Sequence, residues 1–71
     1  MYRIVSRKGL TLERIARTQR GETAMYAAVK RHERWWKTAN GARRYAMKHQ
    51  KALAADGCSV VSEDGELVMK T

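Results

Sequence analysis

Residues 42–57, ARRYAMKHQKALAADG, have the clearest periodicity in the chain and set the helical part of the expected structure. Apolar or small residues and one histidine recur at i, i+3, i+4, i+7, i+10 and i+11, the spacing of one helix face: Ala42, Tyr45, Ala46, His49, Ala52 and Leu53. Asp56-Gly57 follows, with glycine where helices commonly end. We therefore predict a helix that ends at residue 55.

The preceding segment, residues 22–37, predicts another helix. Its apolar positions also follow helical spacing: Met25, Ala28, Val29, His32 and Trp36. The pattern pauses at residues 38–41, where Thr38 or Asn40 can cap a new helix. A helical hairpin is therefore expected. The alternative is one helix over residues 22–55, about 50 Å long at 1.5 Å per residue.

The N-terminal segment predicts a β-hairpin. Residues 2–7 are rich in β-formers and end at the turn signal Lys8-Gly9. Residues 10–18 return as a second strand, although the run LERIAR also tolerates a helix.

The C-terminal segment predicts a second hairpin. Residues 58–63 and 66–69 flank Asp64-Gly65, which favours a two-residue type I′ turn. In that register, four side chains face the helices: Cys58, Val60, Leu67 and Met69. The predicted fold is a single α+β domain, residues 1–71. A small antiparallel sheet, made of the N-terminal and C-terminal hairpins, packs on a two-helix hairpin in the order ββααββ.

Length and composition narrow the class of protein. A core built from 71 residues supplies roughly 3–5 kcal/mol, so a homodimer would add useful stability. No apolar segment approaches the ~20 residues that span a bilayer, and the N-terminus lacks the apolar segment of a signal peptide. The single cysteine, Cys58, cannot form an internal disulfide. We expect a cytoplasmic protein without a membrane partner.

Charge is the strongest signal. The chain has 15 Lys and Arg against seven Asp and Glu, a net charge of +8. Residues 1–54 hold 14 of these bases and three acids, for a net +11, whereas residues 55–71 hold one base and four acids, for a net −3. A field this positive attracts polyanions and accelerates their encounter. Nucleic acid or an acidic protein surface is therefore the expected partner.

The candidate binding site consists of the cations of the two predicted helices. Lys30, Arg34 and Lys37 stand at i, i+4 and i+7, and Arg44, Lys48 and Lys51 repeat that spacing. Side by side, the two helices would present one cationic surface, completed by neighbouring bases and by an aromatic group that can stack on an unpaired base. The predicted binding residues are Lys30, Arg31, Arg34, Trp35, Lys37, Arg43, Arg44 and Lys48.

The leading hypothesis is a small non-enzymatic protein that binds RNA or DNA with low sequence specificity. The alternative is a modulator that docks on an acidic patch of a host protein, with Trp35 and the arginines as anchors. We expect no cofactor and no catalytic residues, because no nucleophile with a base, carboxylate pair or phosphate-cradling loop is present. His32, His49 and Cys58 lack the spacing of metal ligands.

In general character the chain resembles small, self-contained proteins encoded by bacteriophages and prophages. It begins at Met1, has no targeting segment and carries its charge in one basic helical block that ends in the run KHQK, residues 48–51. The resemblance implies an accessory protein that acts on a host macromolecule by occupancy.

Overall fold

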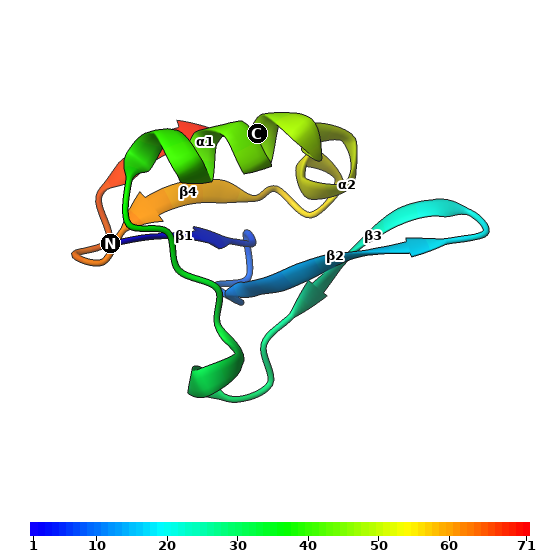
Figure 1. The fold of residues 1–71 in the computed structure, drawn as a ribbon, viewed down its shortest axis with the longest axis horizontal. Helices are drawn as coiled ribbons and strands as arrows, with labels where there is room; N and C mark the ends of the chain where they lie inside the picture. The colour runs from blue at the N-terminus through cyan, green and yellow to red at the C-terminus, as the bar shows by residue number, and fades with distance from the viewer.

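The centre of the molecule is a three-stranded antiparallel sheet with helices over one face (Figure 1). The computed structural model describes residues 1–71. The strands are β1 (Tyr2–Val5), β4 (Ser59–Ser62) and β5 (Leu67–Lys70), in the order β1-β4-β5. Side chains alternate between the two faces of a strand, so the paired Ile4 and Val60 point the same way, and both are fully buried.

Two consecutive helices, α1 (Ala39–Lys48) and α2 (Gln50–Ala55), cover that face. Ala42, Ala46 and Leu53 are fully buried against the sheet, as their spacing predicts. The helix begins where the Thr38 hydroxyl accepts a hydrogen bond from the Gly41 amide at 3.0 Å.

The helical segment ends in a Schellman motif at Gly57. The Gly57 amide donates to the Ala54 carbonyl and the Cys58 amide donates to the Leu53 carbonyl, both at 3.0 Å. Gly57 has a φ of +64°, which glycine adopts without a Cβ penalty. The prediction of a helix ending at residue 55 is confirmed, although the backbone breaks at His49 and divides it into α1 and α2.

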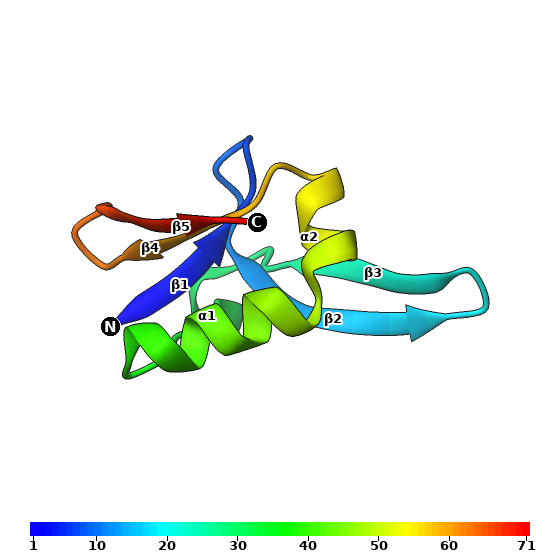
Figure 2. The same ribbon diagram turned by 90° about the horizontal axis from the view of Figure 1, so that it is seen from above.

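A second sheet of two strands projects from this body. It consists of β2 (Leu12–Thr18) and β3 (Gly21–Tyr26), which pair antiparallel from Leu12 opposite Tyr26 to Thr18 opposite Gly21. Leu12 at its base is fully buried, whereas all four residues around the turn, 18–21, are exposed. Figures 1 and 2 show this hairpin extending beyond the rest of the molecule; we call residues 14–25 the β2–β3 arm.

The helix predicted over residues 22–37 is wrong. Residues 21–26 form β3, and only Lys30–His32 are helical, as the short 3₁₀ helix η1. Met25 and Val29, assigned to the apolar face, are 42% and 48% exposed, whereas Ala24 and Tyr26 pack against the core. Pairing with β2 has therefore overridden the weak helical spacing, and the burial period is two residues.

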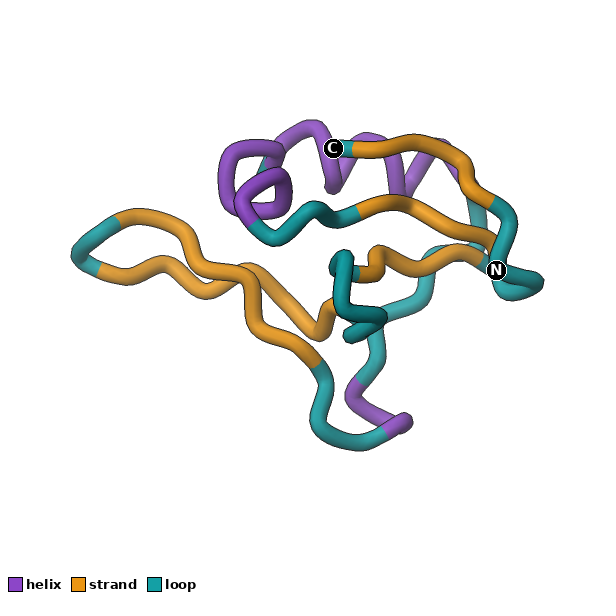
Figure 3. The backbone as a smooth tube through the Cα atoms, turned by 180° about the vertical axis from the view of Figure 1, so that it is seen from behind, coloured by secondary structure: helices purple, strands orange, loops and turns teal.

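The segment that follows η1 joins the two sheets. The Arg34 amide donates to the Leu12 carbonyl of β2 at 3.0 Å, and Trp36 and Tyr2 of β1 exchange two hydrogen bonds of 2.8 Å. The chain thus runs along both sheets before it enters α1. Figure 3 shows η1 at the opposite end of the molecule from the longer helices.

The two predicted hairpins are realised differently. The N-terminal turn forms at Gly9, with φ +88°, but β1 meets β2 only in the bridge between Val5 and Thr11 before the strands diverge into separate sheets. The C-terminal hairpin forms between β4 and β5, with Val60 opposite Met69.

The C-terminal turn and its register need correction. The turn has three residues, 63–65, closed by the Ser62 amide donating to the Glu66 carbonyl at 2.9 Å, with Gly65 at φ +86°. The longer turn shifts the register, so Val61 lies opposite Leu67. Leu67 is consequently 58% exposed and does not face the helices.

The predicted α+β class is confirmed. Antiparallel strands lie at both ends of the chain and two helices lie between them. No helix is both long enough and apolar enough to cross a bilayer.

Candidate functional site

The basic side chains are not neutralised within the protein. Three carboxylates lie within 4.0 Å of a basic nitrogen: Glu63 pairs with the N-terminal amine, Glu13 approaches His32 and Glu22 approaches His49. None of the 15 Lys and Arg side chains forms an ion pair with a carboxylate. The positive potential expected from the sequence is therefore directed outward.

A row of stacked rings runs along one flank of α1. The ring centroids of Trp36 and Tyr45 are 5.1 Å apart, and those of Tyr45 and His49 are 4.6 Å apart. The Arg34 guanidinium carbon lies 5.0 Å from the centroid of Trp36 and 4.8 Å from that of Tyr45, within cation–π range of both. We call Trp36, Tyr45 and His49 the aromatic ladder; all three are half-buried.

Each ring of the ladder is held by a different part of the chain. Pairing with Tyr2 fixes the backbone of Trp36, and the Tyr45 hydroxyl accepts a hydrogen bond from the Ile15 amide at 3.2 Å. The His49 Nδ1 atom lies 2.9 Å from both carboxylate oxygens of Glu22. The ladder therefore connects α1 to both strands of the β2–β3 arm.

The solvent side of the helices carries a group of exposed cations. Because Ala42 and Ala46 face the sheet, the residues on the opposite side of α1 point into solvent. Lys48 follows Tyr45 by three positions and therefore borders the aromatic ladder, and Arg44 lies one turn before Lys48. We define the α1 face as the exposed residues Arg43, Arg44, Met47 and Lys48 of α1 together with the exposed Lys51 of α2.

The structure brings together only part of the predicted site. Arg34 contacts the Tyr45 ring, and Lys48 is one turn from Tyr45 on α1. Arg44 lies one turn before Lys48, Arg43 occupies the other flank of α1, and Lys37 lies two residues before the helix. Lys30 and Arg31 belong to η1, far from α1 in Figures 1 and 3. The predicted pair of neighbouring cationic helices is wrong, because the first of those helices does not form.

Trp35 lies on the other face of the sheet from the ladder. Adjacent residues of an extended chain point to opposite sides, and Trp36 takes the helix side. Trp35 is half-buried, with the Arg3 guanidinium carbon 5.3 Å from its ring centroid. The stacking group predicted beside the cations of the helices is therefore not Trp35; Trp36 and Tyr45 hold that position.

Three exposed arginines on the β2–β3 arm lie outside the predicted site: Arg14, Arg17 and Arg20. The signal was available, since two of them lie within the segment assigned to a strand and the third precedes Gly21. The cations of the predicted site all come from the two predicted helices, and these three arginines lie outside those helices.

A polar cluster lies where the base of the arm meets the body. The Tyr26 hydroxyl donates to Asp56 Oδ2 at 2.6 Å and lies 3.2 Å from Cys58 Sγ. Burial first, and the hydrogen bond to Asp56 next, raise the pKa of Tyr26, and burial raises the pKa of the Cys58 thiol. A thiol with a raised pKa is a poor nucleophile, so this cluster is a structural joint.

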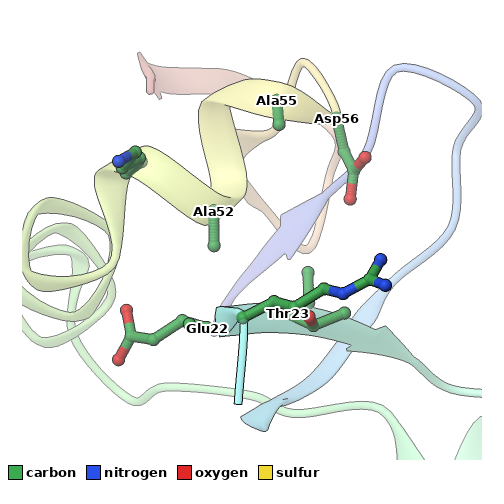
Figure 4. A pocket seen from close by; sticks show the side chains of 9 residues that line it. Glu22, Thr23, Ala52, Ala55 and Asp56 are labelled. Carbon is green, nitrogen blue, oxygen red and sulfur yellow. The ribbon is translucent and has the colours of Figure 1, made fainter. Parts of the chain in front are cut away.

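The largest cavity, about 460 Å³, lies between α2 and the arm. Figure 4 shows Ala52 and Ala55 on the helix side, Glu22 and Thr23 on the strand side, and Asp56 at one end. Arg20 and Lys51 add two cations to a lining that already has two carboxylates. With two cations and two carboxylates, the lining favours neither an anionic nor a cationic ligand.

The metal-ligating residue types do not converge. His32 and His49 each approach a different glutamate, and Cys58 contacts Tyr26. No group of three or more His, Cys, Asp and Glu side chains is arranged to hold a metal ion.

No protein-family model matches the chain, and neither a curated protein nor a solved structure is significantly similar to it.

Proposed function

We propose that the protein binds nucleic acid through the α1 face and the adjoining aromatic ladder. The observation that carries the proposal is the absence of ion pairs at all 15 Lys and Arg side chains. A cation that has no carboxylate partner in the free protein can contact a phosphate without first breaking an internal pair. Each such contact releases counterions from the nucleic acid and adds affinity that does not depend on sequence.

Arg34, Arg44 and Lys48 are the central phosphate contacts. The rings of Trp36 and Tyr45 orient the Arg34 guanidinium, and Arg44 and Lys48 are exposed one turn apart on α1. An arginine oriented by stacking loses less rotamer freedom when it binds a phosphate. Because phosphate contacts carry no sequence information, we expect little discrimination between sequences. The protein acts by occupancy and without chemistry, in the cytoplasm.

The test is the salt dependence of binding to a short DNA duplex. Arg34→Ala with Arg44→Ala removes two proposed contacts and should reduce the slope of log affinity against log salt by about 1.8. The matched control, Arg7→Ala with Lys8→Ala, removes the same charge from the β1–β2 turn, which Figure 2 shows on the side away from α1. Equal changes in the two double variants would reject the α1 face as the site.

A second candidate function is docking on an acidic protein surface. Met47 is 62% exposed and stands among the four cations of the α1 face, an apolar anchor with a charged rim. Met47→Lys distinguishes the two functions, because it adds a cation and removes the anchor. Tighter binding of DNA by this variant favours nucleic acid. Unchanged DNA binding, together with loss of a stoichiometric protein captured from nuclease-treated lysate, favours the protein partner.

A further inference from the structure

The β2–β3 arm is the most exposed charged element of the molecule. Arg14, Arg17 and Arg20 are exposed, and none forms an ion pair. The only carboxylate on residues 14–25 is Glu22, which is already held by His49. The arm therefore carries three free cations and no free acid.

The arginines are distributed around the arm. Beyond the irregularity near Leu12, Arg14 lies opposite Met25 on one face, and Arg17 lies opposite Glu22 on the other. Arg20 is in the turn, where Arg20 and Thr18 are joined by a backbone-to-hydroxyl hydrogen bond of 3.2 Å. Arg14 and Arg17 thus project from the two faces of the arm, and Arg20, near its tip, lines the cavity between the arm and α2.

The remaining positions keep the arm slim. Small residues fill the distal half on both strands: Ala16, Thr18, Gly21, Thr23 and Ala24. Paired strands are about 4.8 Å apart, and the four residues from Ile15 to Thr18 reach about 13 Å at 3.3 Å each. The major groove of B-form DNA is about 12 Å wide and about 8.5 Å deep, and it admits a two-stranded β-ribbon.

Contacts with the body fix the direction of the arm. The Ile15 amide and the Glu22 carboxylate bind Tyr45 and His49, which belong to the helical segment, and the Tyr26 hydroxyl binds Asp56 just after α2. These contacts hold the arm in a fixed direction relative to the helices that carry the α1 face. A polyanion lying on the α1 face meets the arm in a defined orientation.

We propose that the β2–β3 arm enters the major groove of duplex DNA while the α1 face contacts the adjacent phosphate backbone. This inference rests on the proposed function and adds the substrate class. The arm has no aromatic residue within 14–25, so it offers no platform for the stacked bases of a single strand. The major groove of an A-form RNA duplex is deep and too narrow for side chains to read. B-form DNA is the nucleic acid that fits.

The experiment compares a short DNA duplex, its single strand and an RNA duplex of the same sequence. The arm variant combines Arg14→Ala, Arg17→Ala and Arg20→Ala. All three residues are exposed, so we expect the substitutions to preserve the fold. The control variant combines Arg7→Ala, Lys8→Ala and Lys70→Ala, which removes the same charge from outside the arm and the α1 face. Methylation of guanine N7, an atom in the major groove, reports occupancy of that groove.

We expect the wild-type protein to prefer DNA duplex and to protect guanine N7. The arm variant should lose that protection and about a hundredfold in affinity for DNA duplex, while the control variant keeps the protection. Binding without N7 protection, or equal losses on all three nucleic acids, would overturn the groove assignment and leave the proposed function standing. If the wild-type protein bound none of the three nucleic acids, both the groove assignment and the proposed function would be rejected.

Discussion

The helix-covered body and the β2–β3 arm differ in what holds them in place. In the body, Ile4, Val60 and Leu53 are fully excluded from water, and burial of apolar surface supplies the stability. Beyond its base, the arm buries no side chain fully. Ile15 and Ala24 pack against the core at its near end, and hydrogen bonds with Tyr45, His49 and Asp56 add to this attachment. A protein this small can extend a charged element into solvent only if specific hydrogen bonds determine its direction.

The largest effect should come from the body. Leu53→Ala removes a fully buried side chain from α2 and should lower the free energy of unfolding by about 3 kcal/mol. Because a domain of this size has only about 3–5 kcal/mol to lose, the variant should keep at most about 2 kcal/mol and unfold at a much lower urea concentration than the wild type. Met47→Ala, on the exposed side of α1, is the control and should change the same quantity by less than about 0.5 kcal/mol.

An intermediate effect is expected at the joint between the two regions. Tyr26→Phe removes the hydroxyl that binds Asp56 and should lower the free energy of unfolding by about 1.5 kcal/mol at neutral pH. Because the pKa of Tyr26 is raised in the folded state, its contribution is full below the ordinary value of 10.0 and is lost as the pH rises above it. Urea titrations should show the gap between wild type and variant narrowing above pH 10, and a gap that stays constant would contradict this origin.

The smallest effect on global stability should come from the arm. His49→Ala removes the partner of Glu22 and should lower the free energy of unfolding by about 1 kcal/mol or less, since Glu22 is partly solvated. Amide hydrogen exchange should accelerate in the arm and stay slow at Ile4 and Val60. His32→Ala is the matched control, because His32 lies 3.9 Å from Glu13 and both side chains are well exposed. Faster exchange throughout the molecule would show that arm and body open together.

Local signals explain what the sequence predicted. Ala42, Ala46 and Leu53 set the helix, and Gly57 and Gly65 set the turns, because each depends on neighbours within a few residues. The partner of β3 and the pairing of Trp36 with Tyr2 depend on contacts that no local pattern encodes. The apolar residues of 22–37 follow helical spacing. Residues 21–26 nevertheless form a strand, because they pair with β2.

The candidate site also contains residues whose placement follows from local sequence and residues whose placement depends on distant contacts. Arg43, Arg44 and Lys48 were placed correctly on one helix, because their own periodicity carries that information. The neighbourhood of Arg34 was unpredictable, since it depends on the path of the chain between the two sheets. Net charge indicated a polyanion as the partner, but charge counts hold no information about a projecting hairpin.

The lack of ion pairs at the lysines and arginines has a consequence for folding. Like charges concentrated on a small domain repel one another, and this repulsion opposes the compact state. Added salt screens it, so the melting temperature of the free protein should rise with ionic strength. The same salt weakens attraction to a polyanion, so ionic strength should act in opposite directions on folding and on association. A bound polyanion would relieve the repulsion at its source and make the occupied form the more heat-resistant one at low salt.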